Sequence, residues 1–80
     1  SDQRLPSAGA DASAAMMQQR DVFFSGRATK TKIYERAKLR AGNRFRGPAI
    51  VAEYSATTVV LQGWTVRVDA YGNLLLERGR

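Results

Sequence analysis

Turn-forming residues recur so closely along this chain that no long secondary-structure element fits between them. From residue 25 onward the breaks are Ser25-Gly26, Ala41-Gly42-Asn43, Gly47-Pro48, Gln62-Gly63 and Tyr71-Gly72-Asn73. Glycine and proline are the strongest local signals for turns. Parallel βαβ topology is excluded, because no interval holds a crossover helix of about ten residues.

The intervals between these turns have the patterns of short strands. Residues 49–53 and 57–61 are rich in apolar and β-branched residues, and in 64–69 Trp64, Val66 and Val68 alternate with polar residues. Such alternation over four to eight residues is typical of half-buried strands. The predicted fold class is all-β: a small antiparallel barrel or sandwich of about six short strands, with a flexible N-terminal segment. One short helix fits over 14–19, and one helical turn fits over 35–39.

Eighty residues make one domain at most. Residues 1–19 are predicted to be a flexible lead-in or linker, because Ala, Ser, Gly and Asp offer little apolar surface to bury. Residues 20–80 are predicted to form a small β domain, the C-terminal piece of a larger protein. Ten apolar residues form its predicted core: Val22, Phe24, Ile33, Phe45, Ile50, Val59, Val66, Val68, Leu74 and Leu76.

Composition excludes several kinds of chemistry. The chain has no Cys and no His, so it can form neither a disulfide, a zinc–thiolate site nor a Ser-His-Asp triad. The carboxylates Glu53, Asp69 and Glu77 are interpreted as surface groups that pair across strands with Arg67 or Arg78. No catalytic, cofactor-binding or metal-binding residue is assigned in this chain. No run of apolar residues in the sequence is long enough for a membrane span.

Positive charge is concentrated in one third of the chain. The formal net charge is +6, and residues 20–46 alone hold nine basic and two acidic residues. A candidate basic docking face is formed by Lys30, Lys32, Arg36, Arg44 and Arg46. The alternative is a small basic β-barrel that binds single-stranded nucleic acid, which would combine such a groove with stacking aromatic residues. The positions of Phe45 and Ile33 disfavour it, since both are predicted to point inward, and Trp64 is interpreted as a core residue.

The motifs Gly47-Pro48-Ala49, Thr57-Thr58 and Gly63-Trp64 follow one another within residues 33–77. Their order closely resembles the C-terminal end of the hydantoinase A/5-oxoprolinase family. This family includes N-methylhydantoinase subunits and related acetone and acetophenone carboxylase subunits. The residues that carry the resemblance best are structural: Gly47, Pro48, Ala49, Thr57, Thr58, Gly63, Trp64, Gly72 and Asn73. Two features depart from the family pattern: Leu61-Gln62 stands where a proline pair is common, and the density of Lys and Arg is higher.

This resemblance implies a large cytoplasmic parent protein, an ATP-dependent hydrolase of cyclic amides. ATP and Mg would be bound by an actin-like core of which none is present here. The glycines of this chain are isolated and form no phosphate-binding loop. The resemblance therefore implies that this chain alone is no enzyme but a non-catalytic structural or docking domain. Its implied partners are the remainder of the catalytic subunit and a second subunit. No membrane partner is expected, and nucleic acid is the disfavoured alternative.

Overall fold

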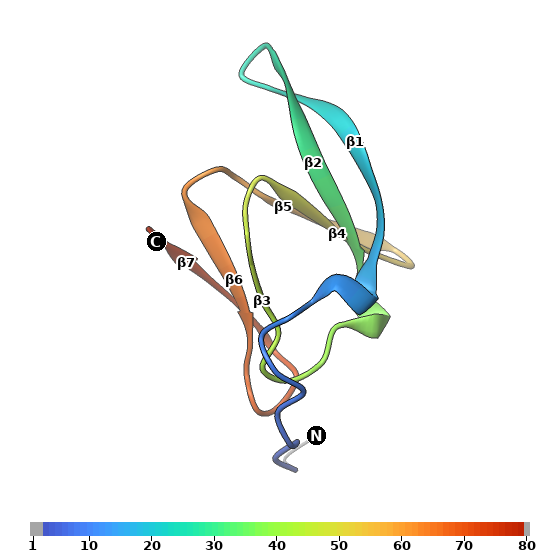
Figure 1. The fold of residues 1–80 in the computed structure, drawn as a ribbon, viewed down its shortest axis with the longest axis vertical. Coiled ribbons are helices and arrows are strands. Elements are labelled where there is room, and N and C mark those ends of the chain that lie inside the picture. The colour runs from blue at the N-terminus through green and yellow to red at the C-terminus, as the bar shows by residue number, and fades with distance from the viewer. Residues whose placement is uncertain (1–2, 80) are drawn as a thin grey trace.

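A computed structural model describes residues 3–79 of the chain (Figure 1). Residues 1 and 2, the start of the predicted lead-in, and Arg80 lie outside the described residues. Within residues 3–79, seven strands and two single 3-10 turns follow one another. They are η1 (Ser13–Ala15), β1 (Met16–Phe24), β2 (Arg27–Glu35), η2 (Arg36–Lys38), β3 (Arg44–Arg46), β4 (Ala49–Glu53), β5 (Ala56–Val60), β6 (Trp64–Val68) and β7 (Leu74–Arg78).

The strands form two sheets that pack as a sandwich and do not close into a barrel. One sheet has the order β1-β2-β4-β5 and the other has the order β3-β6-β7. The all-β prediction is confirmed, and of the two architectures left open the sandwich is observed. The β1–β2 hairpin projects beyond the rest of the molecule (Figure 1).

One strand pair departs from the antiparallel arrangement that the turn spacing predicts. β2 and β4 run parallel, with Lys32 opposite Ala49 and Tyr34 opposite Val51. The connection between them is formed by η2 and by β3, and β3 belongs to the other sheet. The chain thus crosses between parallel neighbours through the second layer of the sandwich and needs no long helix.

The core lies between the two sheets. Tyr34 from β2 stacks on Phe45 from β3, with ring centroids 4.0 Å apart and planes inclined by 23°. Three predicted core residues, Phe45, Val66 and Val68, are buried, and the half-buried Leu74 packs against this core. Val59 and Leu76 are wrong as core residues, because both are exposed. The remaining buried apolar positions were not predicted: Ala12, Ala15, Tyr34, Leu39, Ala41, Ala49, Val51 and Val60.

In strands β4 and β5 the side chains predicted to face the core point away from it, and the alternate side chains face the core instead. Val51 and Val60 are buried, whereas their neighbours Ile50 and Val59 point to the other face of the sheet. Successive side chains of a strand alternate between faces, so a shift of one residue exchanges the two sets. In strands that are apolar at consecutive positions, alternation alone does not reveal which set faces the core.

The N-terminal segment is joined to the sandwich by hydrogen bonds. The amides of Leu5 and Ala8 donate to the carbonyls of Ala70 and Ala41, and the buried side chain of Asn43 donates to the carbonyls of Gly9 and Asp11. Residues 16–19 then begin β1, so the helix considered for 14–19 is wrong and the boundary predicted after residue 19 lies inside a strand. Composition missed these contacts because backbone hydrogen bonds require no apolar side chains.

Candidate docking surfaces

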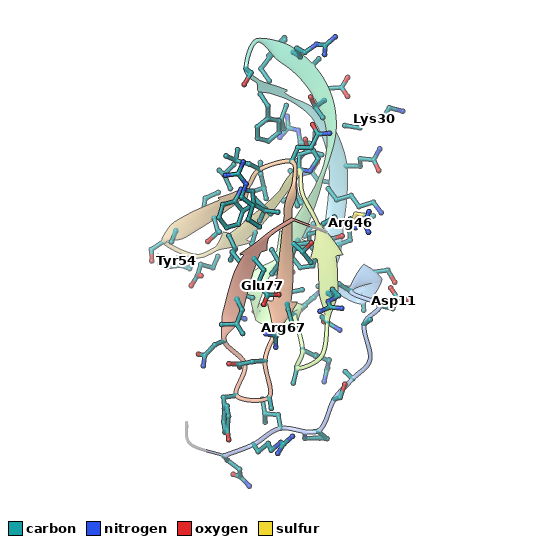
Figure 2. All side chains as sticks on the ribbon, turned by 90° about the vertical axis from the view of Figure 1, so that its left-hand side faces the viewer. Asp11, Lys30, Arg46, Tyr54, Arg67 and Glu77 are labelled. Atoms are coloured by element: carbon teal, nitrogen blue, oxygen red, sulfur yellow. The ribbon has the colours of Figure 1, made fainter. Side chains whose placement is uncertain are left out.

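Four of the five predicted docking cations line one open groove beside the Tyr34–Phe45 pair. Lys30 and Lys32 reach it from β2, and Arg44 and Arg46 reach it from β3. The groove has a volume of about 540 Å³. We call it the basic groove. Figure 2 shows Lys30, Arg46 and Asp11 along one edge of the molecule, with Tyr54 on the opposite edge.

Within residues 3–79 the cations of the basic groove form no ion pair, although Asp21 lies opposite Lys30 across β1 and β2. Residues 3–79 form two ion pairs, Lys38–Glu35 and Arg67–Glu77, and neither includes a cation of the groove. Asp11 is the one carboxylate in the lining, and its Oδ1 accepts the amide hydrogen of Ser13 at 2.9 Å. This hydrogen bond, with a smaller contribution from Lys32, holds the pKa of Asp11 below its usual range.

Arg36, the fifth predicted cation, is not part of the basic groove. Its Nη2 donates a 2.6 Å hydrogen bond to the carbonyl oxygen of Gly72, in the turn between β6 and β7. The guanidinium thereby joins η2 to the turn of the other sheet. The sequence showed that Arg36 lies in the basic segment but held no signal for the direction of its side chain.

A second surface is apolar and lies on the face of the four-stranded sheet that points away from the core. Strand register places Ile33 beside Ile50, and Ile50 opposite Val59. Phe24 lies close to Leu61 and Pro48, around a groove of about 520 Å³. Val59 and Leu61 are exposed, and the others are half-buried. We define the apolar face by these residues: Val22, Phe24, Ile33, Ile50, Val59 and Leu61.

The carboxylates considered for catalysis lie apart in the structure. Glu77 pairs with Arg67 at 3.4 Å across β6 and β7, which confirms the predicted cross-strand contact (Figure 2). Glu53 is exposed at the end of β4, next to the β4–β5 turn. Within residues 3–79 no group of three or more acidic side chains could hold a metal ion. No helix among the described residues is long and apolar enough to span a membrane.

Asp69 closes the turn between β6 and β7. Its Oδ1 accepts the amide hydrogens of Asn73 at 2.8 Å and Tyr71 at 2.9 Å. The bond from Asn73, followed by the bond from Tyr71, holds the pKa of Asp69 below its model-peptide value of 3.8. Hydrogen bonds to a carboxylate stabilise its ionised form. The Asp69 carboxylate therefore has a structural role: it stabilises the turn between β6 and β7.

The lowered pKa of Asp69 predicts an acid-sensitive contribution to stability. A carboxyl with a lower pKa in the folded state stabilises the fold above its unfolded pKa, and this stabilisation is lost as the pH falls through the folded pKa. We expect Asp69→Ala to be less stable than wild type at neutral pH, with the difference shrinking as the pH falls below 3.8, the ordinary pKa of an aspartate. Urea unfolding between pH 7 and pH 2 measures this, and a difference that is constant with pH would contradict it.

The family-motif residues have structural roles in turns and strands. A Cβ at Gly47 would collide with the carbonyl oxygen of Leu61, and Gly63 and Gly72 have φ of +92° and +84° in turns. Pro48 leads into β4, whose first residue, Ala49, is wholly buried. The β5 residues Thr57 and Thr58 are exposed and half-buried, and Trp64 is half-buried against the core. Asn73 bonds Asp69 through its side chain as well as its backbone.

The sequence model of the hydantoinase/oxoprolinase C-terminal domain matches residues 3–78. The chain belongs to this family. The hydantoinase/oxoprolinase C-terminal domain described here is 48% identical over 59 residues to an uncharacterized protein of Methanocaldococcus jannaschii. It also superposes on an acetone carboxylase, solved nucleotide-free in a study of ATP-dependent acetone carboxylation, with a TM-score of 0.84 and 26% identity.

Both relatives are far longer than this C-terminal domain. The match covers 74% of this chain but 9% of the M. jannaschii protein, and the superposition covers 94% of this chain but 11% of the acetone carboxylase chain. The sequence resemblance to the family is thus confirmed for the domain. The positive-φ glycines lie far apart along the chain, and none opens an α-helix within residues 3–79. The described residues therefore do not fit a phosphate loop for ATP and Mg.

Proposed function

We propose that this domain is a non-catalytic docking element of a larger hydantoinase/oxoprolinase-family subunit. The observation that carries this proposal is the apolar face. Strand register places five of its side chains on one side of the four-stranded sheet, and Leu61 directly follows β5 beside Phe24. All six are exposed or half-buried. Large contiguous apolar patches on a protein surface mark interaction sites. A partner that covers the apolar face would bury the strand residues on it, such as Ile33 and Ile50, which the sequence pattern predicts to be buried.

The partner in this proposal is the body of the same subunit, with a second subunit as a further contact. The size of the relatives supports the body of the same subunit as the partner, since the part that matches this domain makes up about a tenth of each relative's chain. Contacts between domains of one chain resemble protein–protein interfaces in size and composition. The docked domain would therefore keep its own core and add a second apolar contact outside it.

For the larger protein we propose ATP-dependent hydrolysis of cyclic amides in the cytoplasm, with ATP and Mg held by the body. The family description supports a hydantoinase or oxoprolinase, and the acetone carboxylase neighbour was studied for an ATP-dependent reaction. No residue of this chain is assigned to that reaction, because its acidic groups lie apart and two of them serve structural contacts. Assays of the full-length subunit with hydantoin or 5-oxoproline and ATP test this assignment.

Footprinting of the full-length subunit tests the docking role. We expect carbene labelling of Phe24, Ile50 and Val59 to be several-fold lower in the full-length subunit than in this 80-residue chain, because docking removes them from solvent. Glu53 and Tyr54, at the exposed β4–β5 turn away from the apolar face, provide the reference. Equal labelling of the apolar face in both proteins would contradict the proposal.

A further inference from the structure

The lining of the basic groove contains more cations than carboxylates. The groove is lined by four cations and one carboxylate, and both ion pairs of residues 3–79 lie elsewhere. The Oδ1 of that carboxylate, Asp11, already accepts the amide hydrogen of Ser13. A concave surface lined by charges of one sign concentrates the electrostatic potential and attracts ligands of the other sign. The basic groove is therefore suited to an anionic partner.

The aromatic rings beside the groove disfavour nucleic acid as that partner. Tyr34 and Phe45 are stacked on each other and are 6% and 8% exposed. Proteins that bind single strands without sequence preference stack bases on exposed aromatic rings. Trp64 is half-buried against the core and does not line this groove. An anionic ligand of the basic groove must therefore be recognised by its charge and shape and not by stacking. Carboxylate groups meet this requirement.

The spacing of the cations fits an extended chain. Lys30 and Lys32 are two residues apart on β2, and Arg44 and Arg46 are two residues apart on β3. Alternate side chains of a strand lie on one face, roughly 6–7 Å apart. An extended polypeptide with acidic residues at alternate positions has the same repeat. The groove also lies beside β1 and β3, each the end strand of its sheet, and end strands readily take an added extended segment.

We propose that the basic groove binds an extended acidic segment, with Asp or Glu at alternate positions, from the body of the subunit that carries this domain. This inference rests on the proposed docking function and gives it a second, electrostatic contact. The apolar face and the basic groove lie on opposite faces of β2, since Ile33 belongs to the first and Lys32 to the second. The body would then contact both faces of this strand.

Zero-length cross-linking of the full-length subunit with a carbodiimide tests the proposal, because the reagent joins a lysine amine only to a carboxylate in contact with it. We expect Lys30 and Lys32 to cross-link to Asp or Glu residues clustered in one segment of the body. Lys38, whose Nζ is 3.6 Å from Glu35, is the internal control and should cross-link within the domain. Raising the salt from about 0.1 M to 1 M shortens the Debye length from ~10 Å to ~3 Å and should reduce the cross-links to the body.

A charge-reversal variant provides the matched comparison. Arg44→Glu combined with Arg46→Glu should lower the yield of the Lys30 and Lys32 cross-links several-fold, because two attractive charges become repulsive. Both arginines are exposed, so thermal unfolding should be close to wild type. The control reverses two exposed cations outside the groove, Arg40→Glu with Arg78→Glu, and should leave the yield unchanged.

The outcomes separate this inference from the docking function. Cross-links of Lys30 and Lys32 that are absent or scattered, on a subunit whose apolar face is protected, would overturn the acidic-segment proposal alone. If the apolar face is also unprotected, both proposals fail. Nanomolar binding of single-stranded RNA at physiological salt, abolished by the Arg44→Glu and Arg46→Glu pair, would replace the acidic segment with nucleic acid.

Discussion

Replacing Phe45 by alanine is expected to unfold most of the domain. The side chain is 8% exposed, and its ring is stacked on Tyr34 at 4.0 Å. Phe45 lies on β3 and Tyr34 on β2, so the pair joins the two sheets. Phe→Ala substitutions in a core cost about 3–5 kcal/mol, which is roughly the whole net stability that the core of such a small domain supplies. Urea unfolding followed by Trp64 fluorescence measures the loss.

Phe23→Ala is the matched control, since it removes the same atoms from a side chain that is 75% exposed. Surface substitutions away from special contacts change stability by about 0.5 kcal/mol or less. The expected result is therefore an unfolding midpoint close to wild type. Equal losses for Phe23→Ala and Phe45→Ala would show that the packing between the sheets differs from the one described.

Gly47→Ala is expected to produce the second large loss of stability. A Cβ at this position would collide with the carbonyl oxygen of Leu61 and lie 2.8 Å from that of Val60. These are backbone atoms of β5 and the segment that follows it, and they cannot rotate away as a flexible side chain would. The Gly47 amide also donates to the carbonyl of Trp64 at 2.9 Å, which ties it to β6. Overpacking of this kind costs about 1–3 kcal/mol, and more where the surroundings cannot relax.

Gly26→Ala separates this collision from the ordinary effect of adding a methyl group to glycine. Gly26 lies at the tip of the β1–β2 hairpin with φ of +77°, and a Cβ there meets nothing within 4 Å. Gly26→Ala should therefore lower the stability only through the left-handed backbone conformation, by about 1–2 kcal/mol. Urea midpoints of the two variants give the comparison. A Gly47→Ala variant no less stable than Gly26→Ala would contradict the close approach at Leu61.

Local pattern was sufficient to predict most strands and much of the basic groove. The bounds of β4 agree with the predicted 49–53, and in β3 Phe45 points inward between two exposed arginines as predicted. Lys30 and Lys32 share one face of β2, as their spacing requires. These features depend on residues close together in the chain, where alternation and turn chemistry determine the geometry. No signal in the sequence indicated that Arg36 would bond outside the groove, because its partner, Gly72, lies 36 residues away.

Only the tertiary structure showed which side chains of the four-stranded sheet face the core. In β4 and β5 apolar residues follow one another, so either alternate set could have been buried. The structure buries Val51 and Val60, which leaves Ile50 and Val59 on the apolar face. The choice depends on the register between β2 and β4, which are neighbours only because the chain passes through the other sheet.

By itself, the sequence determined the all-β class, the turn positions, the absence of thiol and imidazole chemistry, and the family resemblance, since each follows from residue type or short spacing. The tertiary structure decided the parallel β2–β4 pair, the convergence of four cations on one groove, and the position of the apolar face outside the core. These three features depend on contacts between distant residues. Such contacts form only when hydrophobic burial across the whole sandwich selects one register among the many that local preferences allow.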